Sequence, residues 1–234
     1  MNGAIKLDKI KVVIPASGSG QRFGGDVPKQ FLEMGGEPIL KYTLSIFDEL
    51  DIVDEIAVTV PAGYSGHVES YGIKKLRHIV AGKENRAASI YEALKCYATT
   101  NPDSIILIHD GIRPLVTGEL IRNVAAASRK YGAAIACTPV TDTIKEVGES
   151  GKIISTPDRR TLWRAQTPQG FTYGVIKRAY DLAEADDCLG QATDDSVLVE
   201  RLGIPVYIVR GSETNIKITT PSDLQIATAF QERL

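Results

Sequence analysis

The feature that most constrains the fold is a regular alternation of short apolar runs with longer segments of helical periodicity. Unbroken apolar, mostly β-branched runs occur at residues 12–14, 56–60, 105–108 and 133–136. Such runs are typical of strands that are covered on both faces, as in a mostly parallel sheet. Between them lie segments with apolar residues three and four apart: 38–50, 85–97 and 118–131. The alternation predicts an α/β fold with a doubly wound, mostly parallel, Rossmann-like sheet.

The expected helices carry boundary signals. Asn85 and Thr117 stand where an N-cap is needed, because their side chains can accept a hydrogen bond from the first helical turn. Gly132 stands just past the end of the third helical segment, where a glycine C-cap is common.

The pattern changes after residue 139. Residues 141–154 are polar and β-branched, with Gly148 and Gly151 as turn residues, which predicts a β-hairpin that projects from the main sheet. We expect this arm, at about 139–160, to be an insertion into a single domain spanning residues 1–234. Two further strands, at 206–209 and 216–219, and a helix from 221 to about 233 are predicted to follow.

Charge and cysteine content exclude several functional classes. With 27 basic and 29 acidic residues, the net charge of −2 gives no general attraction to nucleic acid or to an anionic membrane. Basic stripes with interleaved aromatic residues, and apolar runs of membrane-spanning length, are also missing from the sequence. The cysteines Cys96, Cys137 and Cys188 are scattered and odd in number, which favours reduced thiols and a cytoplasmic protein.

A glycine-rich loop follows the first apolar run. It is not a P-loop, because Lys29 is followed by Gln30 rather than by serine or threonine. It also fails the dinucleotide pattern, since Phe23 occupies the position of the third glycine. An NAD-type site is therefore disfavoured.

The loop instead combines small residues with cations. Gly18, Gly20 and Arg22 alternate along it, and Lys29 follows after a short interval. In a doubly wound sheet such a loop lets backbone N–H groups approach phosphate oxygens at the carboxyl end of a strand. Two cations beside a phosphate cradle suit phosphoryl or nucleotidyl transfer, where catalysis consists largely of positioning and charge neutralisation.

This loop resembles the N-terminal signature of the nucleotidyltransferases that activate sugars and polyols. Farther along, several segments resemble motifs of the 2-C-methyl-D-erythritol 4-phosphate cytidylyltransferases: 108–114, 158–163, 166–169, 193–195 and 215–219. The matches occur in the family's order and cover nearly the whole chain from about Lys11. Two small departures are Ser17, where alanine is usual, and Ala81, where a glycine commonly precedes Gly82.

The resemblance implies roles for individual residues. Those expected around CTP are Ala16, Ser17, Gly18, Gly20, Gly82, Ser89 and Asp110. Those expected to stabilise charge during catalysis are Arg22, Lys29, Arg159 and Lys217. Those expected to bind the polyol phosphate are Arg113, Thr143, Thr167 and Thr193. The resemblance further implies a homodimer in which Thr143 and Arg159 of the arm reach the neighbouring active site.

The expected reaction brings two polyanions together. A phosphate monoester carries about −1.5 to −2 charges at neutral pH, so the nucleophile needs no general base. Five cations, at positions 22, 29, 113, 159 and 217, would offset the repulsion between the substrates. Mg²⁺ is expected as the cofactor, held mainly by the CTP phosphates, with few dedicated protein ligands. We assign His109 no catalytic role, and we expect Trp163 to pack at the base of the arm.

Three alternatives remain open from the residues. A ribitol 5-phosphate cytidylyltransferase would share the phosphate-handling motifs, although the segments at 158–163 and 193–195 favour the erythritol enzyme. A non-catalytic nucleotide-binding module on the same fold is an alternative of another class, disfavoured because all five cations are present. A glycosyltransferase of similar topology would be expected to carry an Asp-x-Asp motif after a middle strand, and none is found there.

Overall fold

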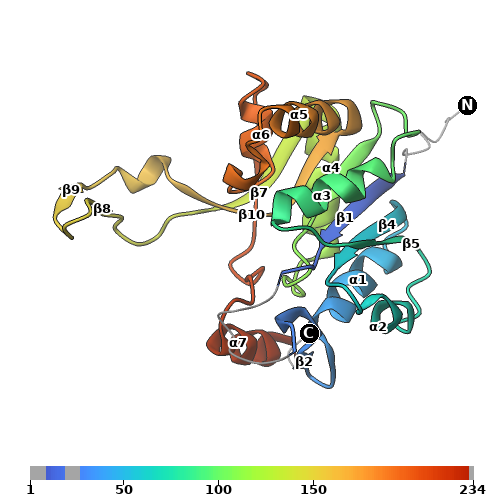
Figure 1. Ribbon diagram of the computed structural model, residues 1–234. Coiled ribbons are helices and arrows are strands. Elements are labelled where there is room, and N and C mark those ends of the chain that lie inside the picture. Colours follow the sequence, from blue (N-terminus) through green and yellow to red (C-terminus); the bar gives the residue numbers. More distant parts are fainter. Residues whose placement is uncertain (1–8, 19–26, 232–234) are drawn as a thin grey trace, which may run out of the picture.

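A seven-stranded sheet forms the centre of the molecule in the computed structural model, which describes residues 9–18 and 27–231 (Figure 1). Its strands, in spatial order, are β11 (Tyr207–Arg210), β7 (Ala133–Pro139), β10 (Trp163–Thr172), β6 (Ile105–Ile108), β1 (Ile10–Pro15), β4 (Val53–Val60) and β5 (Leu76–Ala81). All neighbouring pairs are parallel except those of β10, which runs antiparallel to both β6 and β7. The prediction of a mostly parallel sheet is confirmed.

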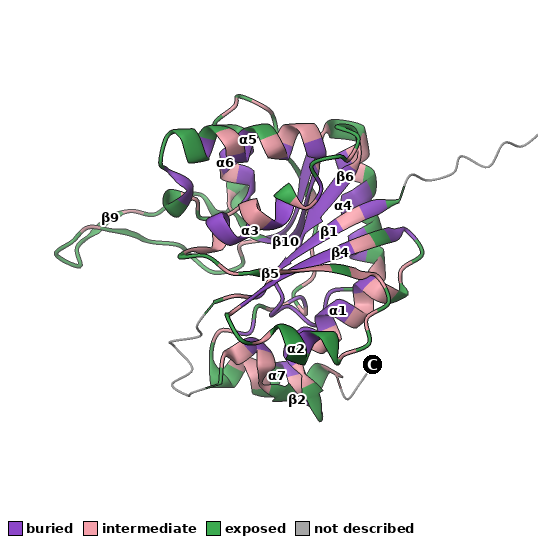
Figure 2. Cartoon of the chain, turned by 45° about the vertical axis from the view of Figure 1, so that its right-hand side comes forward, coloured by how far each residue is buried: buried purple, intermediate pink, exposed green. Residues whose placement is uncertain are grey.

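Helices cover both faces of this sheet. One face packs against α3 (Arg86–Lys95), α5 (Tyr173–Ala185) and α6 (Ser196–Glu200). The opposite face packs against α1 (Ile39–Glu49), α2 (Ser65–Glu69) and α4 (Gly118–Tyr131). Figure 2 shows the strands as the most buried layer between them. Successive strand residues point to opposite faces, so that Val12 and Ile14 join one apolar cluster and Val13 the other. This explains why the runs are apolar throughout.

The predicted helix boundaries agree with the structure. The Asn85 side chain accepts a hydrogen bond from the backbone N–H of Ala88, and that of Thr117 accepts one from Leu120. Each cap satisfies a backbone donor that the helix itself leaves unpaired, a contribution of about 1 kcal/mol. Gly132 ends α4 with a φ of 84°, which an L side chain rarely adopts.

The predicted arm is present as a hairpin. Its strands are β8 (Glu146–Val147) and β9 (Ile153–Ser155), followed by the 3₁₀ helix η3 (Arg159–Thr161). In Figure 1 the arm extends well away from the main sheet. It leaves the sheet at the end of β7 and returns at the start of β10, so the two strands at its base are hydrogen-bonded neighbours. The Trp163 ring lies at this base, with the guanidinium of Arg210 5.8 Å from its centre.

The strand predicted at 216–219 is wrong. This segment makes one backbone hydrogen bond to a neighbour, from the N–H of Ile218 to the carbonyl of Ile112, which belongs to a loop. Because its neighbour is not a strand, no ladder can form. The alternating pattern arises because Ile216 and Ile218 pack into a small third cluster, while Lys217 between them reaches Asp110.

That third cluster joins the end of the chain to the rest of the fold. It contains residues of a two-stranded hairpin, β2 (Glu33–Met34) and β3 (Glu37–Pro38), and of α7 (Pro221–Gln231). The predicted closing helix is thereby confirmed as far as residue 231. Two short 3₁₀ helices, η2 (Lys29–Phe31) and η4 (Leu189–Gln191), complete the described elements. Among the described residues, no helix is long and apolar enough to cross a membrane.

Candidate active site

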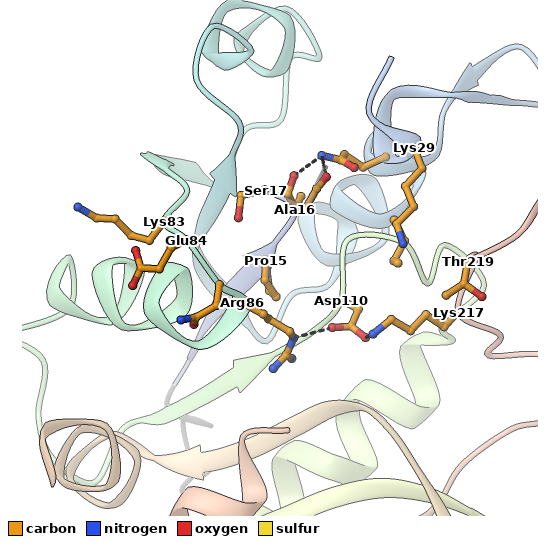
Figure 3. A pocket seen from close by; sticks show the side chains of 14 residues that line it. Pro15, Ala16, Ser17, Lys29, Lys83, Glu84, Arg86, Asp110, Lys217 and Thr219 are labelled. Atoms are coloured by element: carbon orange, nitrogen blue, oxygen red, sulfur yellow. Dashed lines mark hydrogen bonds and ion pairs between the residues drawn. The ribbon is translucent and has the colours of Figure 1, made fainter. Parts of the chain in front are cut away.

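The main pocket lies at the edge of the sheet where the parallel strands end. Its volume is about 410 Å³, within the usual range for small-molecule sites. Three loops line it, which follow β1, β5 and β6, together with η2 and the 216–219 segment. The lining residues are Pro15, Ala16, Ser17, Gly18, Lys29, Gln30, Lys83, Glu84, Asn85, Arg86, Asp110, Ile112, Lys217 and Thr219 (Figure 3).

Gln30 holds the glycine loop against η2. Its buried Nε2 atom donates hydrogen bonds to the carbonyl oxygens of Ala16, at 2.6 Å, and Gly18, at 3.2 Å. The same short helix carries Lys29, whose side chain extends into the pocket in Figure 3. One glutamine therefore couples the position of the backbone cradle to that of a cation that can contact phosphate.

A second pocket adjoins the first. It is lined by Arg86, Asp110, Arg113, Ala165, Gln166, Thr167, Gln169, Thr193, Asp194 and Lys217. Arg86, Asp110 and Lys217 line both pockets, so they form the boundary between them. The antiparallel direction of β10 explains why residues of this strand line the second pocket. Since Gln169 pairs with Ile108, the last residue of β6, the preceding residues of β10 lie beyond the end of β6.

Asp110 is the charge centre of this boundary. Its carboxylate lies 3.1 Å from Nε of Arg86, 3.0 Å from Nζ of Lys217 and 3.5 Å from Nε of Arg113. Burial alone would raise the pKa of Asp110, but the attraction of Arg86, Lys217 and Arg113 outweighs it and holds the pKa well below its ordinary value. The carboxylate therefore stays ionised and offsets the mutual repulsion of three cations.

Arg86 is fixed from its other side by Asp195. Two guanidinium nitrogens of Arg86 contact the two carboxylate oxygens of Asp195, at 3.1 and 2.9 Å. The Tyr180 hydroxyl donates to the same carboxylate at 2.5 Å, and the backbone N–H of Asp195 donates to the Gln169 side chain. Burial would lower the pKa of Arg86, but the charges of Asp195 and Asp110 raise it. A bidentate pair of this kind fixes orientation as well as charge.

His109 is buried and structural. Its Nε2 lies 3.1 Å from the Arg113 carbonyl, and its Nδ1 lies 3.0 Å from Oγ1 of Thr167. A carbonyl can only accept, so Nε2 carries the proton and Nδ1 accepts from the Thr167 hydroxyl. The same hydroxyl accepts from the backbone N–H of Asp110. Burial lowers the pKa of His109 to about 4, which keeps the ring neutral at pH 7.

The structure brings together most of the residues that the sequence singled out. Ala16, Ser17, Gly18, Lys29, Asp110 and Lys217 line the first pocket, and Arg113, Thr167 and Thr193 line the second. Gly82 packs directly on Ser17, where a Cβ atom at position 82 would lie 2.1 Å from that of Ser17. Ser89 is buried behind Ser17. Gly20 and Arg22 lie outside the described residues, so their predicted roles stay predictions.

Two predicted residues lie elsewhere in this chain. Thr143 and Arg159 are exposed on the arm, where Arg159 Nη1 donates to the carbonyl of Thr141 at 2.5 Å. Neither lines either of these two pockets. Their expected action at a neighbouring site therefore depends on a second chain and stays a prediction.

Arg86 and Asp195 are the main residues that the sequence reasoning did not assign. Asp195 belongs to a segment that carries the family resemblance, but the resemblance as described above gives neither residue a role. The signal was available: Arg86 follows the helix cap Asn85, and a cation at a helix N-terminus is electrostatically unfavourable without a nearby anion. That unfavourable placement could have indicated a buried acidic partner. Which acidic residue pairs with Arg86 depends on how α6 packs against α3 and α5. Local sequence patterns do not encode that packing.

Comparison with known proteins agrees with this geometry. A family model described as IspD, 2-C-methyl-D-erythritol 4-phosphate cytidylyltransferase, matches residues 10–233. The chain is 45% identical over 230 residues to the 2-C-methyl-D-erythritol 4-phosphate cytidylyltransferase of Syntrophus aciditrophicus, covering 96% of this chain and 97% of the relative. It is 46% identical to the protein of the same name from Geobacter metallireducens, covering 93% and 95%.

A solved structure shares the fold over its full length. The 4-diphosphocytidyl-2C-methyl-D-erythritol synthase of Anaerococcus prevotii superposes with a TM-score of 0.84 and 32% sequence identity, covering all of both chains.

Removing the charge of Asp110 is expected to destabilise the fold strongly. Asp110→Asn leaves Arg113 and Lys217 without their carboxylate partner and Arg86 with Asp195 alone, so we expect the free energy of unfolding at pH 7 to fall by about 3 kcal/mol or more. Because the folded-state pKa of Asp110 is lowered, its contribution is present above pH 4 and shrinks as the pH falls below about 4, where the unfolded chain binds the proton first. Urea titrations at pH 7 and pH 3 measure both effects.

Asp51→Asn is the matched control for this substitution. Asp51 also pairs with an arginine, Arg122, at 2.6 Å, but its side chain is 79% exposed. We expect a much smaller loss, since water screens an exposed pair. Equal losses in the two variants would show that Asp110 does not hold the charges of the boundary in balance.

Proposed function

The chain belongs to the 2-C-methyl-D-erythritol 4-phosphate cytidylyltransferase family, and on this basis we propose how its two pockets divide the substrates. The chain is a nucleotidyltransferase. It transfers the cytidylyl group of CTP to 2-C-methyl-D-erythritol 4-phosphate, giving 4-diphosphocytidyl-2-C-methyl-D-erythritol and pyrophosphate. The larger pocket takes CTP, and the adjoining pocket takes the phosphate of the acceptor.

The observation that carries this assignment is the shared boundary. Lys217 lines both pockets and lies beside Asp110, so its ammonium can contact the CTP α-phosphate and the acceptor phosphate together. Lys29 enters the first pocket near the same end in Figure 3. Arg113, Thr167 and Thr193 supply donors to the acceptor phosphate in the second pocket.

The chemistry requires positioning rather than activation. An oxygen of the acceptor phosphate attacks the α-phosphorus of CTP, and the bond from that phosphorus to the bridging oxygen of the β-phosphate breaks. The electron pair leaves with pyrophosphate. Because the nucleophile is already anionic, the enzyme lowers the barrier by holding two repelling groups in line and by stabilising charge on the transferred phosphoryl group. Lys29, Lys217 and Arg22 are proposed for the second task.

Mg²⁺ is proposed as the cofactor. When bound to a nucleoside triphosphate, it neutralises charge on the phosphate oxygens and orients the leaving group. Mg²⁺ prefers oxygen ligands, keeps several waters and is bound through one or two carboxylates plus substrate phosphates. The first pocket fits this pattern, since it offers the carboxylate of Asp110, which is ionised at neutral pH, and the CTP phosphates would supply most of the remaining oxygen ligands.

The arm is proposed to complete the active site of a second copy of the chain. It exposes apolar side chains, with Val147, Ile153 and Ile154 at 52%, 54% and 65% exposure. Apolar side chains gathered on a projecting hairpin favour burial against another surface. In a homodimer of this kind, Thr143 and Arg159 would reach the acceptor pocket of the neighbouring chain. Arg159 would then add a cation where the phosphates meet.

The family membership favours methylerythritol phosphate over ribitol 5-phosphate as acceptor. It also disfavours a non-catalytic nucleotide-binding module. The presence of Lys29, Arg113 and Lys217 in the lining of the two pockets supports this view. We place the enzyme in the cytoplasm as a further proposal. It is supported by three scattered free cysteines, of which Cys137 and Cys188 are buried.

A pyrophosphate-release assay tests the function directly. CTP, UTP, ATP and GTP are each combined with methylerythritol phosphate or ribitol 5-phosphate. We expect the highest kcat/KM with CTP and methylerythritol phosphate. A preference for ribitol phosphate would overturn the acceptor assignment. Tight CTP binding without pyrophosphate release from either acceptor would favour a binding module.

Lys29→Ala is expected to lower turnover far more than it lowers CTP affinity. If the Lys29 ammonium acts mainly on charge in the transition state, kcat falls by about 10²-fold or more. Steady-state kinetics and calorimetric titration with CTP separate the two effects. Lys95→Ala is the control, since Lys95 is an exposed residue of α3 that pairs with Glu92. An unchanged kcat in the Lys29 variant would remove this residue from the mechanism.

Mixing two inactive variants tests whether sites are shared between chains. Arg159→Ala is expected to weaken use of the acceptor, and Lys29→Ala to block transfer. If the arm acts in trans, a mixed dimer contains one site that has lost both side chains and one that keeps both. Each mixed dimer should therefore recover about half of the wild-type rate per dimer, since one of its two sites is intact. Absence of any recovery, with mixed dimers verified by tagged subunits, would place Arg159 outside the neighbouring site.

A further inference from the structure

Three hydroxyl groups form a connected chain beside the first pocket. Oγ1 of Thr59 lies 3.3 Å from Oγ of Ser17, which lies 3.0 Å from Oγ of Ser89. At one end, the backbone N–H of Ala16 points to Thr59 Oγ1 at 3.3 Å. At the other end, Ser89 Oγ lies 2.9 Å from the carbonyl oxygen of Asn85. The chain thus links the glycine loop, the end of β4 and the start of α3.

The Asn85 carbonyl, at the end of this row of hydroxyl groups, fixes the direction of every hydrogen bond in it. The Asn85 carbonyl can only accept, so the single proton of the Ser89 hydroxyl is committed to it. Ser17 must then donate to Ser89, and its own proton is committed as well. Thr59 must in turn donate to Ser17. All three protons therefore point toward α3, and reversing one bond would leave two donors or two acceptors facing each other.

Ser89 has no remaining hydrogen-bonding capacity. It donates to Asn85 and accepts from Ser17 and from the backbone N–H of Lys83, at 2.9 Å. Ser17 differs, because it donates once and accepts once, from Thr59. A hydroxyl oxygen has two lone pairs, so one lone pair of Ser17 stays available. Ser17 also lines the first pocket, and its packing against Gly82 restricts its position.

The three hydroxyl groups lie beside the loop that carries Lys83, because the backbone N–H of Lys83 donates to Ser89. Figure 3 shows Lys29 and Lys217, the proposed phosphate ligands, at one side of the pocket, and Lys83 and Glu84 at the other. A nucleotide with its phosphates at the first side extends its base toward the second. The 4-position of a pyrimidine lies opposite the ribose bond, so it reaches farthest from the sugar. Thr59 and Ser89, both fully buried, place the hydroxyl chain at the inner wall of that end.

We propose that the Ser17 hydroxyl is a specificity-determining group that reads the 4-position of the pyrimidine as an acceptor only. The 4-amino group of cytosine can donate to the available lone pair. The 4-oxo group of uracil would place an acceptor against an acceptor, because the Ser17 proton is committed to Ser89. This inference rests on the proposed function. It adds a side-chain contribution to any recognition of cytosine by backbone groups. The family usually has alanine at position 17, so this side-chain contribution to base recognition is particular to this protein.

Ser17→Ala tests the proposal through the ratio of kcat/KM for CTP to kcat/KM for UTP, with methylerythritol phosphate as acceptor. We expect the ratio to fall by about 10-fold, because CTP loses one hydrogen bond and UTP loses one repulsive contact. An unchanged ratio, or an equal loss for both nucleotides, would overturn the proposal.

Ser89→Ala tests the proton order independently. Without the Ser89 acceptor the Ser17 proton is released, and the hydroxyl can rotate to donate to the 4-oxo group of uracil. We expect kcat/KM for UTP to rise by about 10-fold relative to that for CTP. Ser128→Ala is the matched control, because Ser128 makes the same bond to a helix carbonyl four residues earlier, that of Val124, remote from the pocket. A shift in the control equal to that of Ser89→Ala would refute the proton-order argument.

These outcomes are distinct from a failure of the proposed function. If the wild-type enzyme releases no pyrophosphate with CTP and methylerythritol phosphate, the function itself is refuted. If the wild-type enzyme prefers CTP and the Ser17 variant keeps the full preference, only the reading by Ser17 is refuted.

Discussion

The balance of charge around Asp110 is the interaction on which the rest of the site depends. Three cations lie within 3.5 Å of one buried carboxylate, and without it they would repel one another in a region that excludes much of the water. Each cation comes from a different part of the chain: Arg86 from α3, Arg113 from the loop after β6, and Lys217 from the segment before α7. The carboxylate at the end of β6 therefore joins three parts of the fold as well as two pockets. A phosphate that enters either pocket meets cations that are already positioned, which limits the entropy lost on binding.

The arrangement of Arg86 illustrates how that balance is kept rigid. Asp195 and Asp110 contact different nitrogens of the same guanidinium, and Tyr180 fixes Asp195 in turn. Because the planar guanidinium of Arg86 is hydrogen-bonded along two edges, it cannot rotate to adjust to a bound phosphate, whereas a lysine side chain could. The boundary thus combines one rigid cation, Arg86, with one adaptable cation, Lys217. Arg86 keeps the boundary between the pockets fixed, whereas the flexible side chain of Lys217 can adjust to a bound anion.

The sequence predicts much of this structure, and the failures have physical causes. Local signals sufficed for the buried strands and for the caps at Asn85, Thr117 and Gly132, because each depends on a few neighbouring residues. The segment around Lys217 was misassigned as a strand because the alternation of Ile216 and Ile218 reflects packing on a loop. Lys217 was nevertheless expected to bind phosphate, as residue type and motif carried that prediction. Arg86 and Asp195 were not assigned roles because their pairing spans 109 residues and depends on helix packing.

The route of β10 has a mechanical consequence. This ten-residue strand begins at the base of the arm and continues without leaving the sheet to Thr172. Between Ala165 and Gln169 its register with β7 shifts, and within that interruption Gln166 and Thr167 line the acceptor pocket. The segment is nevertheless held firmly, because Gln166 donates to the carbonyl of Ser212 and the carbonyl of Thr167 accepts from Asn215. One strand therefore joins the arm to the charge centre of the site, since the Thr167 hydroxyl contacts His109 and accepts from the backbone N–H of Asp110.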